Sequence, residues 1–507
     1  MGDIQQIGAL VYVPEQRSQL PRLLRECLSA AQPELLAALT GFLDQPGPEA
    51  FLDLEATVLR LFQLASSHVV AGVLVLLHGD ASWADAEVEE AREVSPRPIR
   101  LRGRRETPIH FLGGARLRIE TAYVSEDLRV RCGRRRGVGR RQRSGSGSYP
   151  LLEALGIEQR ATPALRSEVA RQVVRGASNA EAREALAERG IALNEKTVRM
   201  LALGIGARAL DQRQARLDAA REGRVFSNEY AGKRIVVSVD GGRVRLREGG
   251  QRGRRGKKGR RRYRTPWREP KLFVVYVIDK KGKKVREIPA LYDATLGDAD
   301  ATFEILAAEL TLRGAAEAKE IILTGDGAPW IWNRADVLAK ALGLDPKKIV
   351  KVADFYHAVE HLTAIAELCA RWSPPRRKQW VGRMRRHLKA GRVDAVIQAA
   401  RVLCKGRNAA RIRTEVNYFV ERKDRMRYRA FRRRGIPLGS GAVESAIRRV
   451  INLRLKGPSI FWRGPNAERV LHMRAYLKAG RWDELMRRVL HRSPDGEPTC
   501  AARRRAA

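Results

Sequence analysis

The sequence predicts a multidomain α/β protein in which a mixed β-sheet, interrupted by a helical insertion, is preceded by helical regions. Three observations lead to this fold class. Apolar residues recur near 3.6-residue spacing over 15–90, as in amphipathic helices. Strand-like and helix-like segments alternate from residue 233 onward, which is typical of a mixed α/β sheet. Residues 358–432 then have a mostly helical pattern, so the sheet-forming region is divided.

Composition indicates the chemistry of the partner. The 507 residues include 98 Lys and Arg against 57 Asp and Glu, which gives a net charge of +41 and a pI of about 11.0. Such a chain is expected to bind nucleic acid in a salt-dependent way. The longest apolar run, at 69–77, is shorter than the roughly 18 to 20 residues of a membrane span. No export signal is recognisable and the five cysteines are far apart, so we expect a cytoplasmic protein with reduced thiols and no membrane partner.

The first 150 residues are expected to form two different regions. Residues 1–95 are expected to be a helical N-terminal region. Residues 96–150 are expected to be a small strand-rich region followed by a basic linker. Apolar and polar residues alternate over 97–131, as in short antiparallel strands. The stretch 133–148 is almost entirely Gly, Ser and Arg, which cannot build a core.

Residues 151–230 have the start and stop signals of short consecutive helices. Ser178 with Glu181 three residues later is a capping-box pattern. Gly190 is expected to end that helix and Asn194 to cap the next one. This pattern predicts a region like a helix-turn-helix.

A helix-turn-helix would place its second helix in the major groove of DNA. Lys196 and Arg199 lie near the start of that helix and would point toward DNA. An ordinary three-helix bundle explains the same pattern, and the net charge favours the DNA-binding interpretation.

An α/β core is predicted over 231–357, a helical insertion over 358–435, a final helical part of the core over 436–490 and a disordered tail over 491–507. The core elements expected in chain order are strands 234–240, 271–279 and 283–293, a helix 298–313, a strand 320–326, a helix 333–342 and a strand 348–354.

Three carboxylates lie where metal-assisted phosphodiester chemistry requires them. Asp240 ends one strand-like run, Asp326 ends a later one, and Glu444 lies in GSGAVES at the start of a helix. In an RNase H-like fold the first and fourth strands are neighbours, so Asp240 and Asp326 would face each other. Two divalent cations in such a site bind the attacking and leaving oxygens, and acids on rigid elements hold them. Singly, the aspartates also suit turns before glycine, and Glu444 suits a helix N-terminus.

Several longer motifs surround these acids. They are VSVDGG around Asp240, LTGDGAPWIW around Asp326, VADFYHAVEHL, and RMRYRAFRRRGIPLGSGAVESAIRRVINLRLKGPSIFW around Glu444. In these motifs the chain resembles insertion-sequence transposases of the DDE class, especially the ISKra-type group and its Mutator-like relatives. The resemblance covers most of the chain, and most closely 234–482.

This resemblance implies an RNase H-like catalytic core and a DNA transposase that binds terminal inverted repeats and catalyses Mg2+-dependent strand cleavage and strand transfer. It makes Asp240, Asp326 and Glu444 the metal-binding catalytic triad, with two Mg2+ or Mn2+ ions. Asp354 and His357 match the C/D-x-x-H signature between the second and third acids and are expected at the catalytic site. Double-stranded DNA, a homo-oligomer on paired ends and a nucleoid-associated location in the cytoplasm are also implied.

One departure concerns 97–150, where similar proteins lead us to expect a cysteine pair. Cys132 has no near partner there, which leaves a zinc ribbon unsupported.

Three other functions are compatible with parts of the sequence. His357, Glu360 and His361 have the H-x-x-E-H spacing of a zinc peptidase, but peptide hydrolysis gives no reason for the charge. A related metal-dependent nuclease or resolvase would cleave without strand transfer. A transposase-derived protein that only binds DNA is the third alternative.

Further cations and aromatic residues are expected to contact DNA. The segment 411–435 has ten Lys and Arg with interleaved aromatic residues, and the loop 243–264 has twelve Lys and Arg with five Gly. Both suit phosphate binding, although a solvated helix face also explains the first, and the loop is expected to be disordered without DNA. Tryptophans of the insertion would either stack on an extruded base or belong to the core. The residues expected to bind DNA in these segments are Arg254, Arg255, Lys257, Lys258, Arg425, Arg432, Arg433, Trp372 and Trp380.

Overall fold

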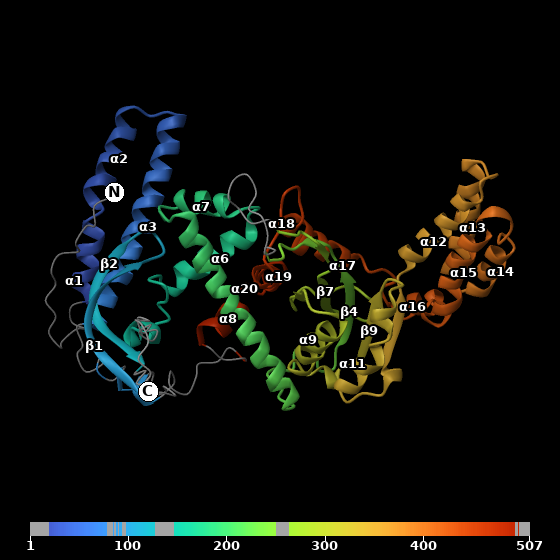
Figure 1. The fold of residues 1–507 in the computed structure, drawn as a ribbon. Coiled ribbons are helices and arrows are strands. Elements are labelled where there is room, and N and C mark those ends of the chain that lie inside the picture. The colour runs from blue at the N-terminus through green and yellow to red at the C-terminus, as the bar shows by residue number, and fades with distance from the viewer. Residues whose placement is uncertain are drawn as a thin grey trace. The chain divides into compact units, whose positions relative to one another are not determined.

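The computed structural model describes residues 20–78, 85, 88–89, 91–93, 98–126, 147–249, 263–491 and 495. The chain divides into two compact units, Met1–Ile205 and Gly206–Ala507 (Figure 1). The division falls inside helix α8 (Glu195–Arg221), and therefore within the region 151–230 that the sequence predicts as one domain. Each unit is described by itself.

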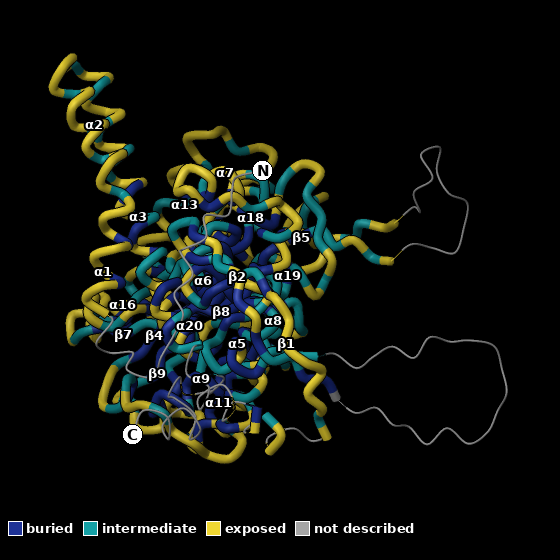
Figure 2. The backbone as a smooth tube through the Cα atoms, turned by 90° about the vertical axis from the view of Figure 1, so that its left-hand side faces the viewer, coloured by how far each residue is buried: buried dark blue, intermediate teal, exposed yellow. Residues whose placement is uncertain are grey.

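The first unit begins with helices, as the sequence predicts. These are α1 (Leu20–Ser29), α2 (Gln32–Asp44) and α3 (Pro48–His78). Helix α2 has no buried residue and is drawn mostly as exposed in Figure 2. By length and composition alone α3 is apolar enough to cross a membrane, and 39% of its most apolar window is buried. The prediction of no membrane-spanning segment rests on uninterrupted apolar runs and does not anticipate this helix.

A small antiparallel sheet follows, in the region predicted to be strand-rich. Its strands, in the order β1-β2-β3, are β1 (Ile99–His110), β2 (Arg116–Glu126) and β3 (Gly147–Ser148). Cys132, the expected strand 128–132 and most of the basic linker lie outside the described residues.

The helical signals of the next region are confirmed at atomic level. The helices are α5 (Pro150–Ala154), α6 (Pro163–Arg175), α7 (Asn179–Ala187) and α8. The backbone N–H of Glu181 donates to Oγ of Ser178 at 3.0 Å, and the N–H of Thr197 donates to Oδ1 of Asn194 at 2.8 Å. Gly190 has a φ of 73°, which suits a helix end because glycine adopts positive φ without strain.

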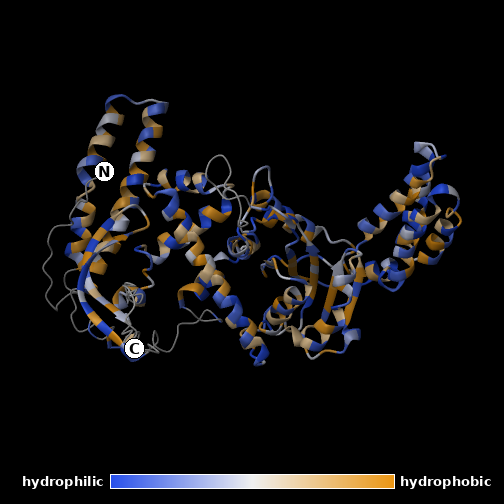
Figure 3. Cartoon of the chain, viewed as in Figure 1, coloured by the Kyte–Doolittle hydropathy of each residue, from blue (hydrophilic) through white to orange (hydrophobic). Residues whose placement is uncertain are grey.

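A mixed five-stranded sheet organises the second unit. Its strands are β4 (Arg234–Gly241), β7 (Lys271–Ile278), β8 (Leu291–Thr295), β9 (Glu320–Gly325) and β10 (Ile349–Ala353), in the order β10-β9-β4-β7-β8. Strand β4 pairs antiparallel with β7 and parallel with β9, and β9 pairs parallel with β10. Runs of Val and Ile are buried in the central strands, which are coloured hydrophobic in Figure 3. The first and fourth strands of the sheet are therefore neighbours, as predicted.

The boundaries of two predicted elements differ from the structure. The expected strand 283–293 is a strand only over β8, and Lys284 makes an isolated bridge to Ile278. The expected helix 333–342 is α11 (Ala335–Ala341), which follows the short α10 (Pro329–Trp332). A two-stranded ribbon, β5 (Val244–Arg245) with β6 (Trp267–Arg268), borders the undescribed part of the basic loop.

Helices complete the second unit. Those of the core are α9 (Ala299–Thr311), α17 (Gly441–Ala446), α18 (Leu453–Leu455), α19 (Gly464–Ala479) and α20 (Trp482–His491), with a π-helical segment, Ile447–Asn452, between α17 and α18. Those of the predicted insertion are α12 (Phe355–Leu368), α13 (Pro374–Lys389), α14 (Val393–Arg401), α15 (Ala409–Arg422) and α16 (Tyr428–Arg433).

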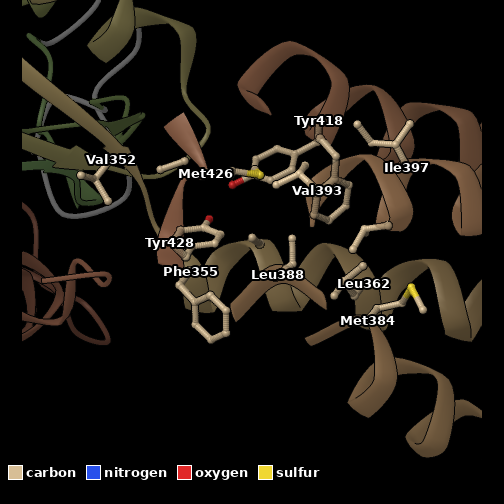
Figure 4. Packing of buried hydrophobic residues seen from close by; sticks show 14 of the residues in the cluster. Val352, Phe355, Leu362, Met384, Leu388, Val393, Ile397, Tyr418, Met426 and Tyr428 are labelled. Carbon is tan, nitrogen blue, oxygen red and sulfur yellow. The ribbon is translucent and has the colours of Figure 1, made fainter. Parts of the chain in front are cut away.

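The insertion has its own packed interior, which continues into the sheet. Leu362, Leu388 and Ile397 meet between its helices, as Figure 4 shows. Val352 of β10 belongs to the same cluster of buried residues. The cluster also includes Ile322 of β9 and Val236 of β4, so the interior of the insertion is continuous with buried residues of several strands and the insertion is not a separate lobe on a linker.

Candidate active site

Asp240 and Asp326 lie at the same end of two adjacent parallel strands. Ser238 of β4 pairs in register with Thr324 of β9, and their side-chain oxygens are 2.5 Å apart. Each aspartate lies two residues beyond its member of this pair. Since the carboxyl ends of parallel strands meet at one edge of the sheet, the backbone brings the two acids together there, as predicted.

The environment of Asp240 connects it with both other predicted acids. Burial raises the pKa of Asp240 to about 6, and the negative charges of Asp326, Glu444 and Glu269 act in the same direction. A hydrogen bond from the N–H of Gly241 to Oδ1, 2.7 Å long, opposes this change in pKa. The charges of both other predicted acids thus act on Asp240.

Asp326 is fixed by its own loop and by the insertion. Its Oδ1 accepts a 2.8 Å hydrogen bond from the N–H of Ala328, and its carbonyl oxygen accepts one of 2.9 Å from Nε1 of Trp332. The guanidinium of Arg422, on α15, donates to the carbonyl oxygen of Gly327 through Nε at 3.1 Å and Nη2 at 2.5 Å. The sequence marks Arg422 only as one cation of a basic segment, because its partner is 95 residues away.

After the insertion the chain returns to the sheet at α17, the helix that bears Glu444. Glu444 is exposed on α17, which packs against β4 and β7. Its Oε1 lies 3.0 Å from Oγ of Ser440. Helix α17 runs directly into the π-helical segment, a feature that is frequent at functional sites.

Asp354 is a buried junction between the insertion and α17. Its Oδ1 accepts from the N–H groups of Tyr356 and His357 at 2.6 and 2.9 Å, which caps α12. Its Oδ2 accepts from both the N–H and the Oγ of Ser440. The side chain is 1% exposed, so the geometry fits a positioning residue better than the predicted catalytic one.

His357 and His361 share a face of α12 but have different partners. Nδ1 of His357 lies 3.1 Å from Oε2 of Glu360, and Nδ1 of His361 lies 2.5 Å from Oε2 of Glu415. The ring of His361 stacks on Tyr418 at 3.7 Å, and burial lowers the pKa of His361. His361 is therefore engaged in packing within the insertion, which gives the zinc-peptidase alternative no support.

Of the residues expected to bind DNA, the exposed ones lie on two helices. Lys196 and Arg199 are exposed on α8, and Arg432 and Arg433 are exposed on α16. Arg425 is half-buried, with its guanidinium 4.7 Å from the ring of Trp332. The four predicted loop cations lie outside the described residues: Arg254, Arg255, Lys257 and Lys258.

The tryptophans of the insertion pack with each other. Trp380 is 6% exposed and lies in the interior of the insertion, which favours the core alternative over base stacking. Trp372 is half-buried against it, with ring centroids 5.8 Å apart. The aromatic residues interleaved with the basic segment are also buried: Tyr418, Phe419, Tyr428 and Phe431.

The chemistry of the three acids suits a hard divalent cation, because Mg2+ and Mn2+ prefer carboxylate oxygens. Burial is the main cause of the raised pKa of Asp240 and neighbouring negative charges add to it; a bound cation would offset those charges. Among the described residues, no group of three or more His, Cys, Asp or Glu side chains is close enough to hold a metal ion. Asp240, Asp326 and Glu444 would therefore have to approach each other for an ion to bind.

Comparisons of the chain with family models, curated proteins and solved structures found no match.

Proposed function

We propose that this protein is a DDE-class DNA transposase with an RNase H-like catalytic core. One observation carries the proposal: Asp240 and Asp326 end adjacent parallel strands, and the charges of Asp326 and Glu444 both act on the carboxyl group of Asp240. Counted along the chain, the strands of the sheet have the order three-two-one-four-five, which supports the RNase H-like assignment. The net charge of +41 supports DNA as the substrate.

The proposed reaction assigns separate roles to the residues of the site. Asp240, Asp326 and Glu444 would hold the cations. When bound, such ions lower the pKa of the attacking group and stabilise the charge of the transition state. Ser440 and Asp354 hold the segment that bears Glu444, and Arg422 holds the loop that bears Asp326. Water attack at an element end and attack of the freed 3′-hydroxyl on target DNA would use the same carboxylates, without a covalent protein intermediate.

The test uses the full chain, Mg2+, a target plasmid and labelled duplexes taken from the DNA that flanks the coding region. Joined product supports transposition, cleavage alone supports a nuclease, and retention without cleavage supports a protein that only binds DNA. Asp240→Ala should abolish both cleavage and joining and leave DNA retention intact. Glu269→Gln is the matched control, because the charge of Glu269 also acts on Asp240 but Glu269 is not one of the three proposed ligands. Equal loss in both variants would contradict the assignment of the three acids.

A further inference from the structure

Helix α13 of the insertion exposes a face made of cations. Its sequence, PPRRKQWVGRMRRHLK, has seven Lys and Arg and no Asp or Glu. The buried residues Trp380, Met384 and Leu388 form one ridge along the helix, as their i, i+4, i+8 spacing requires. Six exposed cations occupy the rest of the surface; they are Arg376, Lys378, Arg383, Arg385, Arg386 and Lys389. We call these six residues the α13 face.

The α13 face has no acidic partners within the part of the chain that the structure describes. Several buried arginines of the same unit are paired with acids, as Arg216 is with Glu309 and Arg481 with Glu229. No cation of the α13 face forms such a pair with a described residue. Two of these cations lie near aromatic rings instead: Arg376 lies 5.0 Å from the ring of Trp372, and Lys389 lies 5.8 Å from that of Phe355.

A second cationic helix continues this surface. Helix α16 packs against α13. Arg429 of α16 lies beside Gly391, just after α13 ends, and a Cβ atom added to that glycine would be 3.4 Å from the Cβ of Arg429. Helix α16 has three exposed arginines and no acid: Arg429, Arg432 and Arg433. Like charges at this density repel each other, so an anionic partner would stabilise the arrangement.

The shape of the face favours duplex DNA over a lipid surface. A helix that binds a membrane presents exposed apolar residues beside its cations, and α13 has no large exposed hydrophobic residue. From Arg376 to Lys389 the helix rises about 20 Å. That length matches roughly six base pairs of duplex, over which phosphates are regularly spaced.

We propose that the α13 face binds the phosphate backbone of double-stranded DNA. The choice of DNA rests on the proposed function. Contacts of this kind position the duplex and are independent of base sequence. The insertion is joined to the loop of Asp326 through Arg422 and to Glu444 through Asp354 and Ser440. DNA bound to the insertion would therefore be held by the same helical region that positions Asp326 and Glu444.

The salt dependence of binding tests this proposal. The affinity of the full chain for a labelled duplex of arbitrary sequence is measured without divalent metal, between roughly 50 and 200 mM salt. The test variant combines Lys378→Gln, Arg383→Gln and Arg386→Gln, three exposed side chains that pair with no acid among the described residues. The control combines Lys340→Gln, Lys347→Gln and Lys348→Gln, which remove the same charge from exposed positions near Asp336 and Asp345.

The test variant should reduce the slope of log affinity against log salt by about 2 to 3, because each lost phosphate contact removes about 0.9. The control should change the slope by less than about 1. Equal changes in both variants, or an unchanged slope in the test variant, would overturn the proposal. Loss of binding to phosphatidylserine vesicles with unchanged DNA binding would also overturn it. This binding assay contains no divalent metal and does not depend on cleavage. A failure of strand cleavage in the separate cleavage assay would therefore contradict only the proposed function.

Discussion

At the scale of single residues, Ser440 has one proton to share between two carboxylates. Its Oγ lies 3.0 Å from Oε1 of Glu444 and also bonds Oδ2 of Asp354. A hydroxyl donates only one hydrogen bond, so it serves one ionised carboxylate at a time. The N–H of Ser440 keeps a bond to Asp354 in either case. The hydroxyl can therefore orient Glu444 without leaving the buried Asp354 unpaired.

Ser440→Ala tests this positioning role. We expect the apparent affinity for Mg2+ in strand cleavage to fall about 10- to 100-fold, because a group that orients a metal ligand is removed. The free energy of unfolding should fall by only about 1 to 2 kcal/mol, since one hydrogen bond is lost. Ser445→Ala, at an exposed position of α17, should change neither quantity. An unaltered Mg2+ dependence in Ser440→Ala would show that the hydroxyl does not orient Glu444.

Asp240 makes stability depend on pH. Burial and the acids around it raise its pKa from 3.8 to about 6 in the folded state, so the folded protein binds the extra proton between these values. Stability therefore falls as pH rises through this window and stays low above it. Asp240→Asn should raise the free energy of unfolding by about 1 to 2 kcal/mol at neutral pH, after allowance for partial exposure.

Thermal unfolding measured without metal from pH 4 to pH 8 checks this expectation. The difference in unfolding midpoint between Asp240→Asn and the parent protein should be small near pH 4 and should increase as pH rises. Asp424→Asn changes an exposed acid and should shift the midpoint equally at all pH values. A gap for Asp240→Asn that is independent of pH would mean that Asp240 is not held at an unfavourable charge.

At the scale of elements, the insertion meets the core at Gly327. A Cβ at this position would lie 2.5 Å from Cε2 of Tyr418, a ring that is buried in the insertion. An aromatic ring in a packed interior cannot move by the required distance without repacking its neighbours. Gly327 is thus the place where α15 can approach the loop of Asp326.

Gly327→Ala should lower the free energy of unfolding by about 1 to 3 kcal/mol, the usual effect of overpacking, and should reduce cleavage because the loop of Asp326 shifts.

Gly382→Ala is a control in which the free energy of unfolding should change in the opposite direction. Gly382 lies within α13 with no atom within 4 Å of its Cβ position, so alanine should stabilise the helix by about 0.5 to 1 kcal/mol. Denaturant unfolding compares the two. Equal stabilisation by both would show that α15 has room to move.

The elements of the core are predictable because their signals are local. Strand β4 is a short run rich in Val that ends in Asp-Gly, β9 is a short run of Ile and Leu directly followed by Asp-Gly, and α9 starts at a capping Asp298. Helix α12 begins at Phe355, earlier than the predicted insertion, because Asp354 caps it. A cap three residues before His357 is visible in the sequence, but the family resemblance assigns the D-x-x-H motif to catalysis instead.

The contacts that assemble the site are not predictable from spacing. Arg422 with Gly327 and Ser440 with Asp354 are separated by 95 and 86 residues, and nothing in the sequence distinguishes Arg422 from the cations around it. The sequence likewise leaves the burial of Trp380 open to two interpretations, because periodicity does not say which side of a helix is covered by the rest of the fold. Strand adjacency can be predicted, whereas side-chain partners depend on how the insertion packs.

At the scale of the whole second unit, buried ion pairs join elements that are distant in sequence. Arg313 contacts Glu309 on α9 and Glu484 on α20, and Arg481 contacts both Glu484 and Glu229. Buried charges are tolerated only when they are paired, and removal of one partner leaves the others uncompensated. This network connects α9, which follows strand β8, with the last described helix of the chain.

Glu484 is the residue whose protonation should make the stability of this network depend on pH. Burial alone would raise its pKa, but Arg313, Arg488 and Arg481 outweigh this effect and lower the pKa from 4.5 to about 2. A lowered folded-state pKa contributes stability that is complete above the unfolded value and is lost as pH falls from about 4.5 toward 2. Glu484→Gln should therefore weaken the unit by about 3 to 5 kcal/mol at neutral pH, because three arginines lose a buried partner.

Hydrogen exchange resolved by segment measures this effect. In Glu484→Gln the amides of α9 and α20 should exchange faster together at neutral pH, and the difference from the parent protein should shrink as pH approaches 2. Glu287→Gln makes the same chemical change at an exposed position and should leave both helices protected. Faster exchange in α20 alone would mean that the ion pairs hold that helix locally and do not connect it with α9, since cooperative units open as a whole.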